Sequence, residues 1–96
     1  MTPAPSVTIR ASLRVAAKLG LHARPSTAVA RLVAKFASRV SLSWNGATAD
    51  GRSIIELMTL NVPGGAEIAV EATGSDAPAL IEALRGLLEE TVKFDG

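Results

Sequence analysis

Cysteine is absent from this 96-residue sequence, and histidine occurs only once. Without cysteine the chain cannot form a disulfide framework, a thiolate metal site or a cysteine nucleophile, and such a composition is typical of cytosolic proteins. A single histidine cannot supply the three or four nitrogen and sulfur ligands of common zinc sites. We therefore expect a cytoplasmic protein that uses neither a metal ion nor another cofactor.

Long apolar runs and aromatic side chains are scarce as well. No apolar run approaches the ~20 residues of a membrane span, and the first residues lack the charged and apolar regions of a signal peptide. Only Phe36, Trp44 and Phe94 are aromatic, although 48% of the residues are hydrophobic. The core must therefore consist of Ala, Val, Leu and Ile side chains. We expect a flexible arm over residues 1–7, which contain two prolines, and a single domain over residues 8–96 with no membrane partner.

Acidic residues are missing from the first half of the chain, where Asp50 is the first one. Seven basic residues and the histidine precede Asp50, whereas nine acidic and three basic residues stand from Asp50 onward. The two halves therefore carry formal charges of +7 and −6. Such a separation favours an anionic ligand or an acidic partner near the first half, unless the fold interleaves the halves and cancels the field.

Hydrophobic spacing predicts four strands. Polar and apolar residues alternate at positions 12–16, 40–44 and 67–72, as they do in half-buried strands. The pair Asn45-Gly46 is a strong hairpin signal, so residues 47–50 should return as a short antiparallel strand.

Three helices are predicted between and after these strands. Pro25 suits the first turn of a helix, and Ser53 with Glu56 matches a capping box that opens a short helix over residues 53–60. The Gly74–Asp76 turn offers a cap for the last helix. The order β-α-β-β-α-β-α predicts an α+β open-faced β-sandwich. The apolar stripes of the long helices are Val29, Leu32, Val33 and Phe36 in the first and Leu80, Ile81, Leu84, Leu87 and Leu88 in the last.

His22 lies just before the predicted start of the first helix and is the candidate functional residue. Backbone N–H groups and the dipole at a helix start favour bound anions, and Arg24 can offer donors to phosphate oxygens. Pro25 fixes where the helix begins, and a neutral imidazole has a nitrogen lone pair that can act as a nucleophile. Together these parts make a site that can accept a phosphoryl group. In an arbitrary chain, however, a histidine and an arginine at the start of a helix would more often have no function of this kind.

The motif Gly20-Leu-His-Ala-Arg-Pro-Ser26 resembles the phosphorylation site of the histidine-containing phosphocarrier (HPr) family of the phosphoenolpyruvate-dependent sugar phosphotransferase system. The motif also lies at the expected place relative to the other predicted strands and helices. This agreement favours a phosphorylation site at His22 over a histidine without a function. The resemblance implies a four-stranded antiparallel sheet with three helices on one face. The sequence leaves the oligomeric state open, although a relay protein works best as a monomer. The resemblance extends from about Leu13 to Leu88 and includes Asn45-Gly46, the Gly51–Ile55 segment, Gly65 and the Gly74–Asp76 turn.

By this resemblance, His22 would carry the phosphoryl group on its Nδ1 atom, and Arg24 would contact the phosphoryl oxygens. The donor would be phosphorylated enzyme I, charged from phosphoenolpyruvate, and the acceptor would be a histidine on an EIIA-type protein. The chain would be a phosphoryl carrier with a transient phosphohistidine rather than a stand-alone enzyme. Ser53 matches the position that an HPr kinase/phosphorylase modifies in some members, although its role as a helix cap already explains a serine there.

The resemblance also implies a surface for these partners. Ile54, Ile55 and Met58 match positions of an exposed apolar patch beside the histidine, and Thr27 and Arg31 would flank that patch. Because two adjacent residues on a short helix rarely point the same way, we expect one of Ile54 and Ile55 to face outward. A small apolar patch rimmed by arginine suits a transient interface.

Three positions depart from the family pattern. Leu19 stands where several members have a polar residue that helps to support the site, Asn61 replaces a usual glycine, and Ser26 replaces a common alanine. A left-handed backbone conformation can accommodate Asn61 at a helix end. Ser26 is expected to matter little.

Three other functions stay open at this point. Within the family, the chain could be a regulatory carrier of a nitrogen-related or incomplete phosphotransferase chain. It could also be a non-catalytic α+β interaction domain in which His22 is incidental. A nucleic-acid-binding module is the third alternative, but no aromatic side chains stand beside the basic residues to stack on bases.

Overall fold

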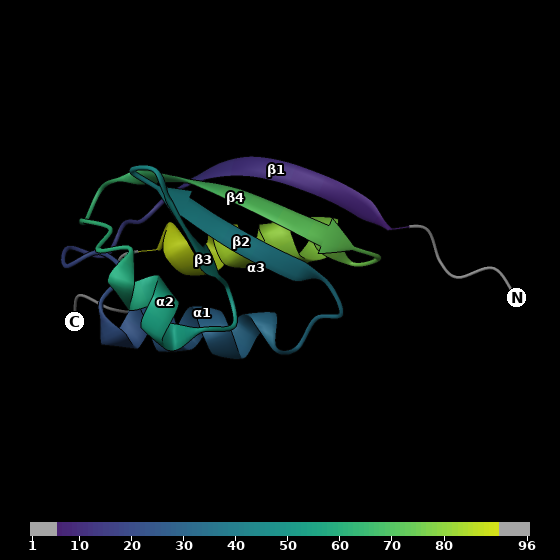
Figure 1. The fold of residues 1–96 in the computed structure, drawn as a ribbon, viewed down its shortest axis with the longest axis horizontal. Helices are drawn as coiled ribbons and strands as arrows, with labels where there is room; N and C mark the ends of the chain where they lie inside the picture. Colours follow the sequence, from purple (N-terminus) through teal and green to yellow (C-terminus); the bar gives the residue numbers. More distant parts are fainter. Residues whose placement is uncertain (1–5, 91–96) are drawn as a thin grey trace, which may run out of the picture.

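A four-stranded antiparallel sheet forms one layer of the molecule and three helices form the other (Figure 1). The computed structural model describes residues 6–90, so residues 1–5 of the predicted arm lie outside the described residues, while Val7 already belongs to the first strand. In chain order the elements are β1 (Val7–Arg14), α1 (Ala23–Val33), β2 (Arg39–Trp44), β3 (Ala47–Asp50), α2 (Ile54–Thr59), β4 (Glu67–Gly74) and α3 (Ala77–Leu88).

The strand order β1-β4-β2-β3 brings the two charged halves of the chain together. β4 comes from the acidic half and lies between β1 and β2 of the basic half. Across this junction Nε of Arg10 lies 3.0 Å from Oε2 of Glu71. Within residues 6–90, however, no side chain of α1 forms an ion pair. Interleaving therefore cancels charge on the sheet but leaves α1 basic.

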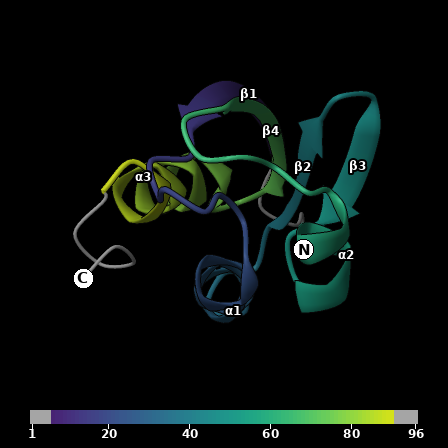
Figure 2. The same ribbon diagram turned by 90° about the vertical axis from the view of Figure 1, so that its left-hand side faces the viewer.

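All three helices lie on the same face of the sheet, as predicted (Figure 2). Strand residues that point to this face, such as Leu13 and Leu42, are fully buried, because side chains alternate between the two faces of a strand. They meet helical side chains such as Leu80. Phe36 and Trp44 are only partly buried against this cluster. The core is thus aliphatic, as the composition predicted.

The boundaries of the first two elements differ from the hydrophobic pattern. β1 ends at Arg14, so Val15 and Ala16 lie in the next loop, although the alternation predicted a strand there. Their N–H groups donate to backbone carbonyls of the loop before β4 and of the end of α3, both at 2.9 Å, which keeps them buried outside the sheet. α1 ends at Val33, so Phe36 lies beyond the helix whose stripe it was predicted to extend.

The start of the last helix also differs from the prediction. Asp76 occupies the N-cap position of α3 but makes no capping hydrogen bond. Its carboxylate instead accepts hydrogen bonds from the N–H groups of Ala37 and Ser38, both at 2.9 Å, and from the Ser38 hydroxyl. The hydroxyl of Ser38 and the N–H of Ala37 hold the pKa of the Asp76 carboxyl below its ordinary value. The turn before α3 is thereby tied to the connection between α1 and β2.

Candidate functional site

His22 is the N-cap residue of α1, directly before the first helical residue, Ala23. Its backbone is extended, with φ −79° and ψ −168°, and its carbonyl accepts the N–H of Ser26 at 3.0 Å. The imidazole is half-buried and makes no capping hydrogen bond. Pro25 is the third helical residue rather than the first, but it still falls in the turn where a missing N–H breaks no helical bond. The ring is therefore available at the electropositive end of a helix.

The loop that leads to His22 is fixed by close backbone packing. Gly20 has φ +70°, a left-handed conformation that favours glycine, and a Cβ atom there would collide with the carbonyl oxygen of Val62. The next residue, Leu21, is buried and donates its N–H to the same Val62 oxygen at 3.0 Å. In the facing loop, a Cβ atom at Gly64 would collide with the Lys18 carbonyl. Two loops thus lie backbone against backbone, which sets the position of the histidine.

Ser26 has a larger role than the sequence indicated. Its side chain is fully buried, and its hydroxyl donates to the Leu21 carbonyl at 3.1 Å. Together with the bond between the Ser26 N–H and the His22 carbonyl, this contact closes the loop onto the first turn of α1. The expectation that Ser26 matters little is therefore wrong for the local structure. A serine one position after a first-turn proline was the only signal that could have pointed to it.

The exposed side of α1 presents basic side chains next to the histidine. Arg24 and Arg31 are exposed, and with Thr27 they line a shallow hollow on the helix surface. The hydroxyl of Thr27 donates to the Ala23 carbonyl at 2.7 Å, so its proton is already engaged. The first turn of α1 contains no acidic residue. The helix start can therefore attract an anion without competition from a neighbouring carboxylate.

Helix α2 forms the second part of the site. Ser53 caps it, because its Oγ atom accepts the N–H of Glu56 at 3.1 Å. The predicted capping box is only half formed, since the Glu56 carboxylate accepts the Asp50 N–H at 3.0 Å instead of the Ser53 N–H. The hydrogen bond between Glu56 and Asp50 fastens α2 to the end of β3.

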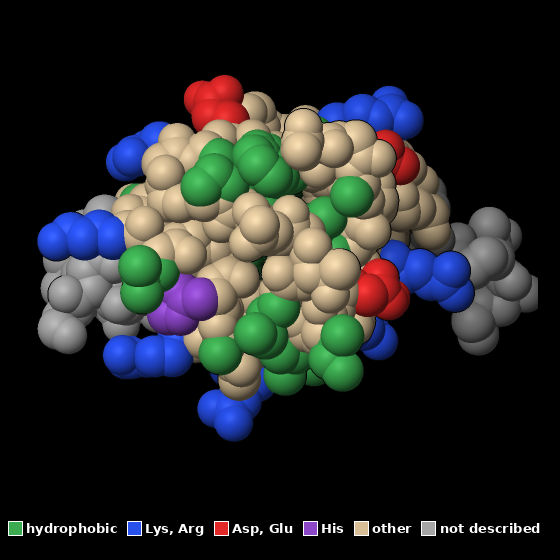
Figure 3. All heavy atoms as spheres, turned by 60° about the vertical axis from the view of Figure 1, so that its left-hand side comes forward, with side chains coloured by type: hydrophobic (Ala, Val, Ile, Leu, Met, Phe, Trp, Pro, Cys, Tyr) green, Lys and Arg blue, Asp and Glu red, His purple; other side chains and the backbone are tan. Residues whose placement is uncertain are grey.

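Helix α2 exposes all three apolar side chains that the resemblance placed in a patch. Ile54, Ile55 and Met58 are 38%, 78% and 43% exposed, so both isoleucines face outward rather than one. Leu57 is fully buried and, within this helix, provides the contact with the core. Figure 3 shows hydrophobic side chains gathered near the purple imidazole, with several Lys and Arg side chains around it. We call Ile54, Ile55 and Met58 the α2 patch.

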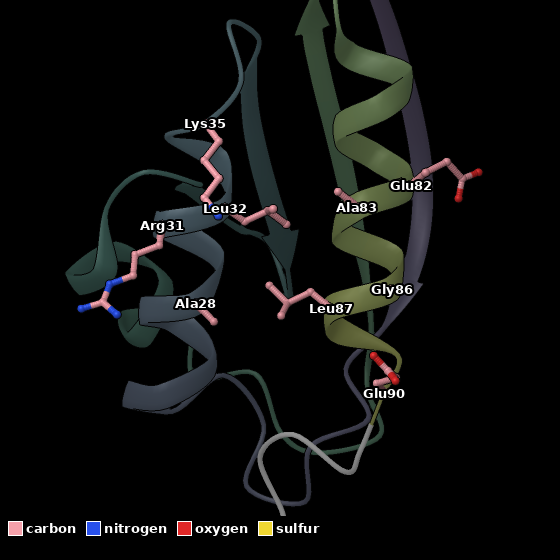
Figure 4. Close-up of a pocket in the computed structure, with 9 residues that line it drawn as sticks. All are labelled: Ala28, Arg31, Leu32, Lys35, Glu82, Ala83, Gly86, Leu87 and Glu90. Carbon is pink, nitrogen blue, oxygen red and sulfur yellow. The ribbon is translucent and has the colours of Figure 1, made fainter.

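A separate hollow lies between α1 and α3 (Figure 4). Leu32 and Leu87 point toward each other across it, whereas Arg31 points away from α3. His22 is not among the residues that line this hollow, so the hollow is not part of the candidate site. The other residues around it are Ala28, Lys35, Glu82, Ala83, Gly86 and Glu90.

Two further features were sought in the described part of the chain. Residues 6–90 contain no group of three or more His, Cys, Asp or Glu side chains that could hold a metal ion. No helix in the same range is long and apolar enough to cross a membrane.

Comparison with known families identifies the kind of protein to which this site belongs. Residues 9–90 match the family model described as the phosphorylation site of the HPr component of the phosphotransferase system. The chain belongs to the HPr family. The matched range includes His22, Arg24 and the whole α2 patch. HPr is the phosphocarrier of the phosphotransferase system, and the open-faced sandwich is its fold, as the resemblance implied.

Individual relatives agree with this assignment. The phosphocarrier protein HPr of Mycoplasma capricolum is 33% identical over 79 residues, which are 82% of this chain and 89% of that protein. A multiphosphoryl transfer protein of Xanthomonas campestris is 37% identical over 87 residues, or 91% of this chain. The chain spans only about a tenth of that relative, since the match covers 10% of its length.

Solved structures of the family superimpose well on this chain. The crystal structure of HPr from Bacillus anthracis has a TM-score of 0.80 at 28% identity and covers 84% of this chain and 96% of its own. HPr-C-His from Thermoanaerobacter tengcongensis also has a TM-score of 0.80, at 30% identity, with coverage of 84% and 91%.

Proposed function

We propose that this chain accepts a phosphoryl group from phosphorylated enzyme I on His22 and passes it to a histidine of an EIIA-type protein. The observation that carries the proposal is the position of the imidazole, which lies at the N-cap of α1 with no capping hydrogen bond and two residues before the exposed Arg24. A site of this kind in a member of the HPr family suits a phosphoryl carrier.

The chemistry needs few groups. The lone pair of Nδ1 of His22 forms a new N–P bond while the N–P bond of the donor phosphohistidine breaks and returns its electron pair to the donor ring. Phosphoryl transfer depends chiefly on in-line positioning and on stabilising charge on the three equatorial oxygens. Arg24 and the N–H groups of the first turn of α1 would provide that stabilisation. Because both bonds are N–P bonds, the group can move in either direction.

The surface around His22 supports a transient complex with each partner. The α2 patch lies on one side of the site, and Arg31 and Thr27 extend it along α1. Helix α1 has no ion pair among residues 6–90, so its arginines are available to acidic side chains of a partner. Apolar contact provides affinity, whereas charge complementarity provides rapid association and correct orientation. Both features suit a carrier that must bind and release two proteins in turn.

Ser53 is a proposed regulatory site of the same carrier. An HPr kinase/phosphorylase would add a phosphate at the start of α2, directly before the α2 patch. Negative charge is favourable at a helix start, so α2 should remain folded after modification. The same charge would repel acidic partners, which makes modification of Ser53 a means of reducing transfer to and from His22.

The proposed carrier function is tested by labelling. The protein is incubated with phosphoenolpyruvate and enzyme I, or with phosphoramidate as a small-molecule donor, and its intact mass is measured before and after acid treatment. We expect one acid-labile phosphoryl group in the wild type and none in His22→Ala. If neither donor labels His22, the proposal is wrong. Labelling by phosphoramidate but not by enzyme I would instead point to a different protein donor.

A further inference from the structure

Large exposed hydrophobic side chains are unevenly distributed over the described residues. They occur at five positions, three of which form the α2 patch. Of the other two, Val7 is 40% exposed at the start of β1, and Leu19 is 75% exposed three residues before His22. Single exposed leucines are common on protein surfaces and by themselves indicate nothing. The significance of Leu19 depends on how the structure holds it and on what lies beside it.

The loop around Leu19 is ordered by specific backbone contacts. The N–H of Gly20 donates to the Ala17 carbonyl at 2.9 Å, and the N–H of Leu21 donates to the Val62 carbonyl at 3.0 Å. Leu21 takes the buried position in this loop, with only 3% of its surface exposed. Leu19 therefore cannot turn into the core without displacing Leu21 and its hydrogen bond. The loop holds the Leu19 side chain in water beside the candidate phosphorylation site.

The same contacts place Leu19 at the end of the molecule that carries the α2 patch. Val62 belongs to the segment that directly follows α2, and α2 packs against α1, whose N-cap is His22. In Figure 3 a hydrophobic side chain touches the purple imidazole on one side, and a larger hydrophobic group lies on its other side. Lys and Arg side chains lie near both groups, and an Asp or Glu side chain borders the larger one. The histidine is thus flanked by apolar surface rather than bordered on one side by a single patch.

We propose that Leu19 is a docking residue for the phosphoryl donor, and that the donor covers it with an apolar pocket rimmed by acidic side chains. This inference rests on the proposed carrier function. In-line transfer requires the donor to approach the His22 ring directly, so the side chains that flank the ring must enter the interface. Leu19 and the α2 patch would then fix the approach from two sides, and Arg24 and Arg31 would select the acidic rim. Burial of Leu19 in the complex removes a large apolar surface from water.

The test compares three variants with the wild type. Leu19→Asn keeps the branched shape and the number of side-chain heavy atoms of leucine but is polar, and Leu19→Met restores an apolar side chain. Val7→Thr is a polar control substitution at the start of β1, the end of that strand farther along the chain from Leu19. Transfer from phosphorylated enzyme I of the same organism is measured by rapid quench over a range of carrier concentrations, which separates KM from kcat. Labelling of each variant by phosphoramidate and its melting temperature are measured in parallel.

We expect Leu19→Asn to raise KM about tenfold with little change in kcat, since burying a leucine side chain typically contributes at least this factor. Leu19→Met and Val7→Thr should keep the wild-type KM, and all variants should react equally with phosphoramidate. A wild-type KM for Leu19→Asn would overturn the inference. So would slower labelling of Leu19→Asn by phosphoramidate, because Leu19 would then act on the ring itself. If neither enzyme I nor phosphoramidate phosphorylates the wild type, the proposed carrier function is wrong, and the docking role of Leu19 is wrong with it.

Discussion

Replacing Gly20 by alanine tests how the fold positions the candidate histidine. The Gly20 backbone is left-handed, with φ +70°, and a Cβ atom there would overlap the Val62 carbonyl oxygen. Gly46 provides a matched control, because it is also left-handed, with φ +83°, but a Cβ atom at Gly46 would have no atom within 4 Å. Alanine at Gly46 therefore measures the backbone strain alone. Alanine at Gly20 measures the same strain plus separation of the two loops.

The structure allows the two effects to be estimated. A left-handed alanine costs about 1–2 kcal/mol in either variant. At Gly20 the overlap must be relieved by moving the loop, which breaks the hydrogen bond from Leu21 to Val62 at about 1 kcal/mol. Partial exposure of the buried Leu21 side chain adds roughly 1–2 kcal/mol. Gly20→Ala should therefore be about 2–3 kcal/mol less stable than Gly46→Ala. In a domain of this size that difference corresponds to a melting temperature roughly 10–20 °C lower.

Two assays check this estimate. Thermal unfolding followed by circular dichroism gives the difference between the variants, and transfer from phosphorylated enzyme I at a temperature where both are folded reports on His22. Because a misplacement of ~1 Å can slow a reaction about a hundredfold, Gly20→Ala should lose most of its transfer rate, whereas Gly46→Ala should keep it. Equal melting temperatures and equal transfer rates would refute the idea that the approach of the loop to Val62 positions the histidine.

Three further predictions follow from individual contacts. The pKa of the Asp76 carboxyl is lowered in the folded protein, so Asp76 stabilises the fold above the carboxyl pKa of the unfolded chain. This stabilisation is lost as the pH falls through the pKa of the folded state. Asp76→Asn should therefore remove part of the acid-induced loss of stability, measured by urea titrations between pH ~5 and ~2. Ser53→Ala removes the cap of α2 and should reduce the free energy of unfolding by about 1 kcal/mol in the same titrations, while Ser53→Thr stays near the wild type. Arg24→Ala should slow phosphorylation of His22 by about a hundredfold, a loss typical of removing one charge-stabilising donor. Arg24→Lys should recover only part of the rate in quench-flow measurements. A wild-type rate in Arg24→Ala would exclude Arg24 from the site.

Patterns within a few residues of one another predicted most of the local structure. The hairpin at Asn45-Gly46, the short capped helix after Ser53 and the helix behind His22 all depend on neighbouring residues, and the structure contains all three. Asn61 adopts the left-handed conformation expected at a helix end, with φ 56°. Such signals are visible in the sequence because turns and helix caps are determined by local chemistry.

Contacts between distant segments were not visible in the same way. Asp76 looks like a helix cap, but the fold brings Ser38 near it, and the carboxylate binds there instead. Ile55 could not be placed on the surface from its neighbours, because its exposure depends on how α2 is rotated against the core. Tertiary packing decided each of these cases.

The most direct test of the carrier function is to identify the phosphorylated atom. The protein is labelled with nitrogen-15 histidine, and its spectrum is recorded during incubation with phosphoenolpyruvate and enzyme I. Because the chain has one histidine, a single imidazole is observed. We expect a phosphorus–nitrogen coupling on Nδ1 of His22 that disappears when an EIIA-type acceptor is added. An unchanged imidazole spectrum while enzyme I is fully phosphorylated would contradict the proposed function.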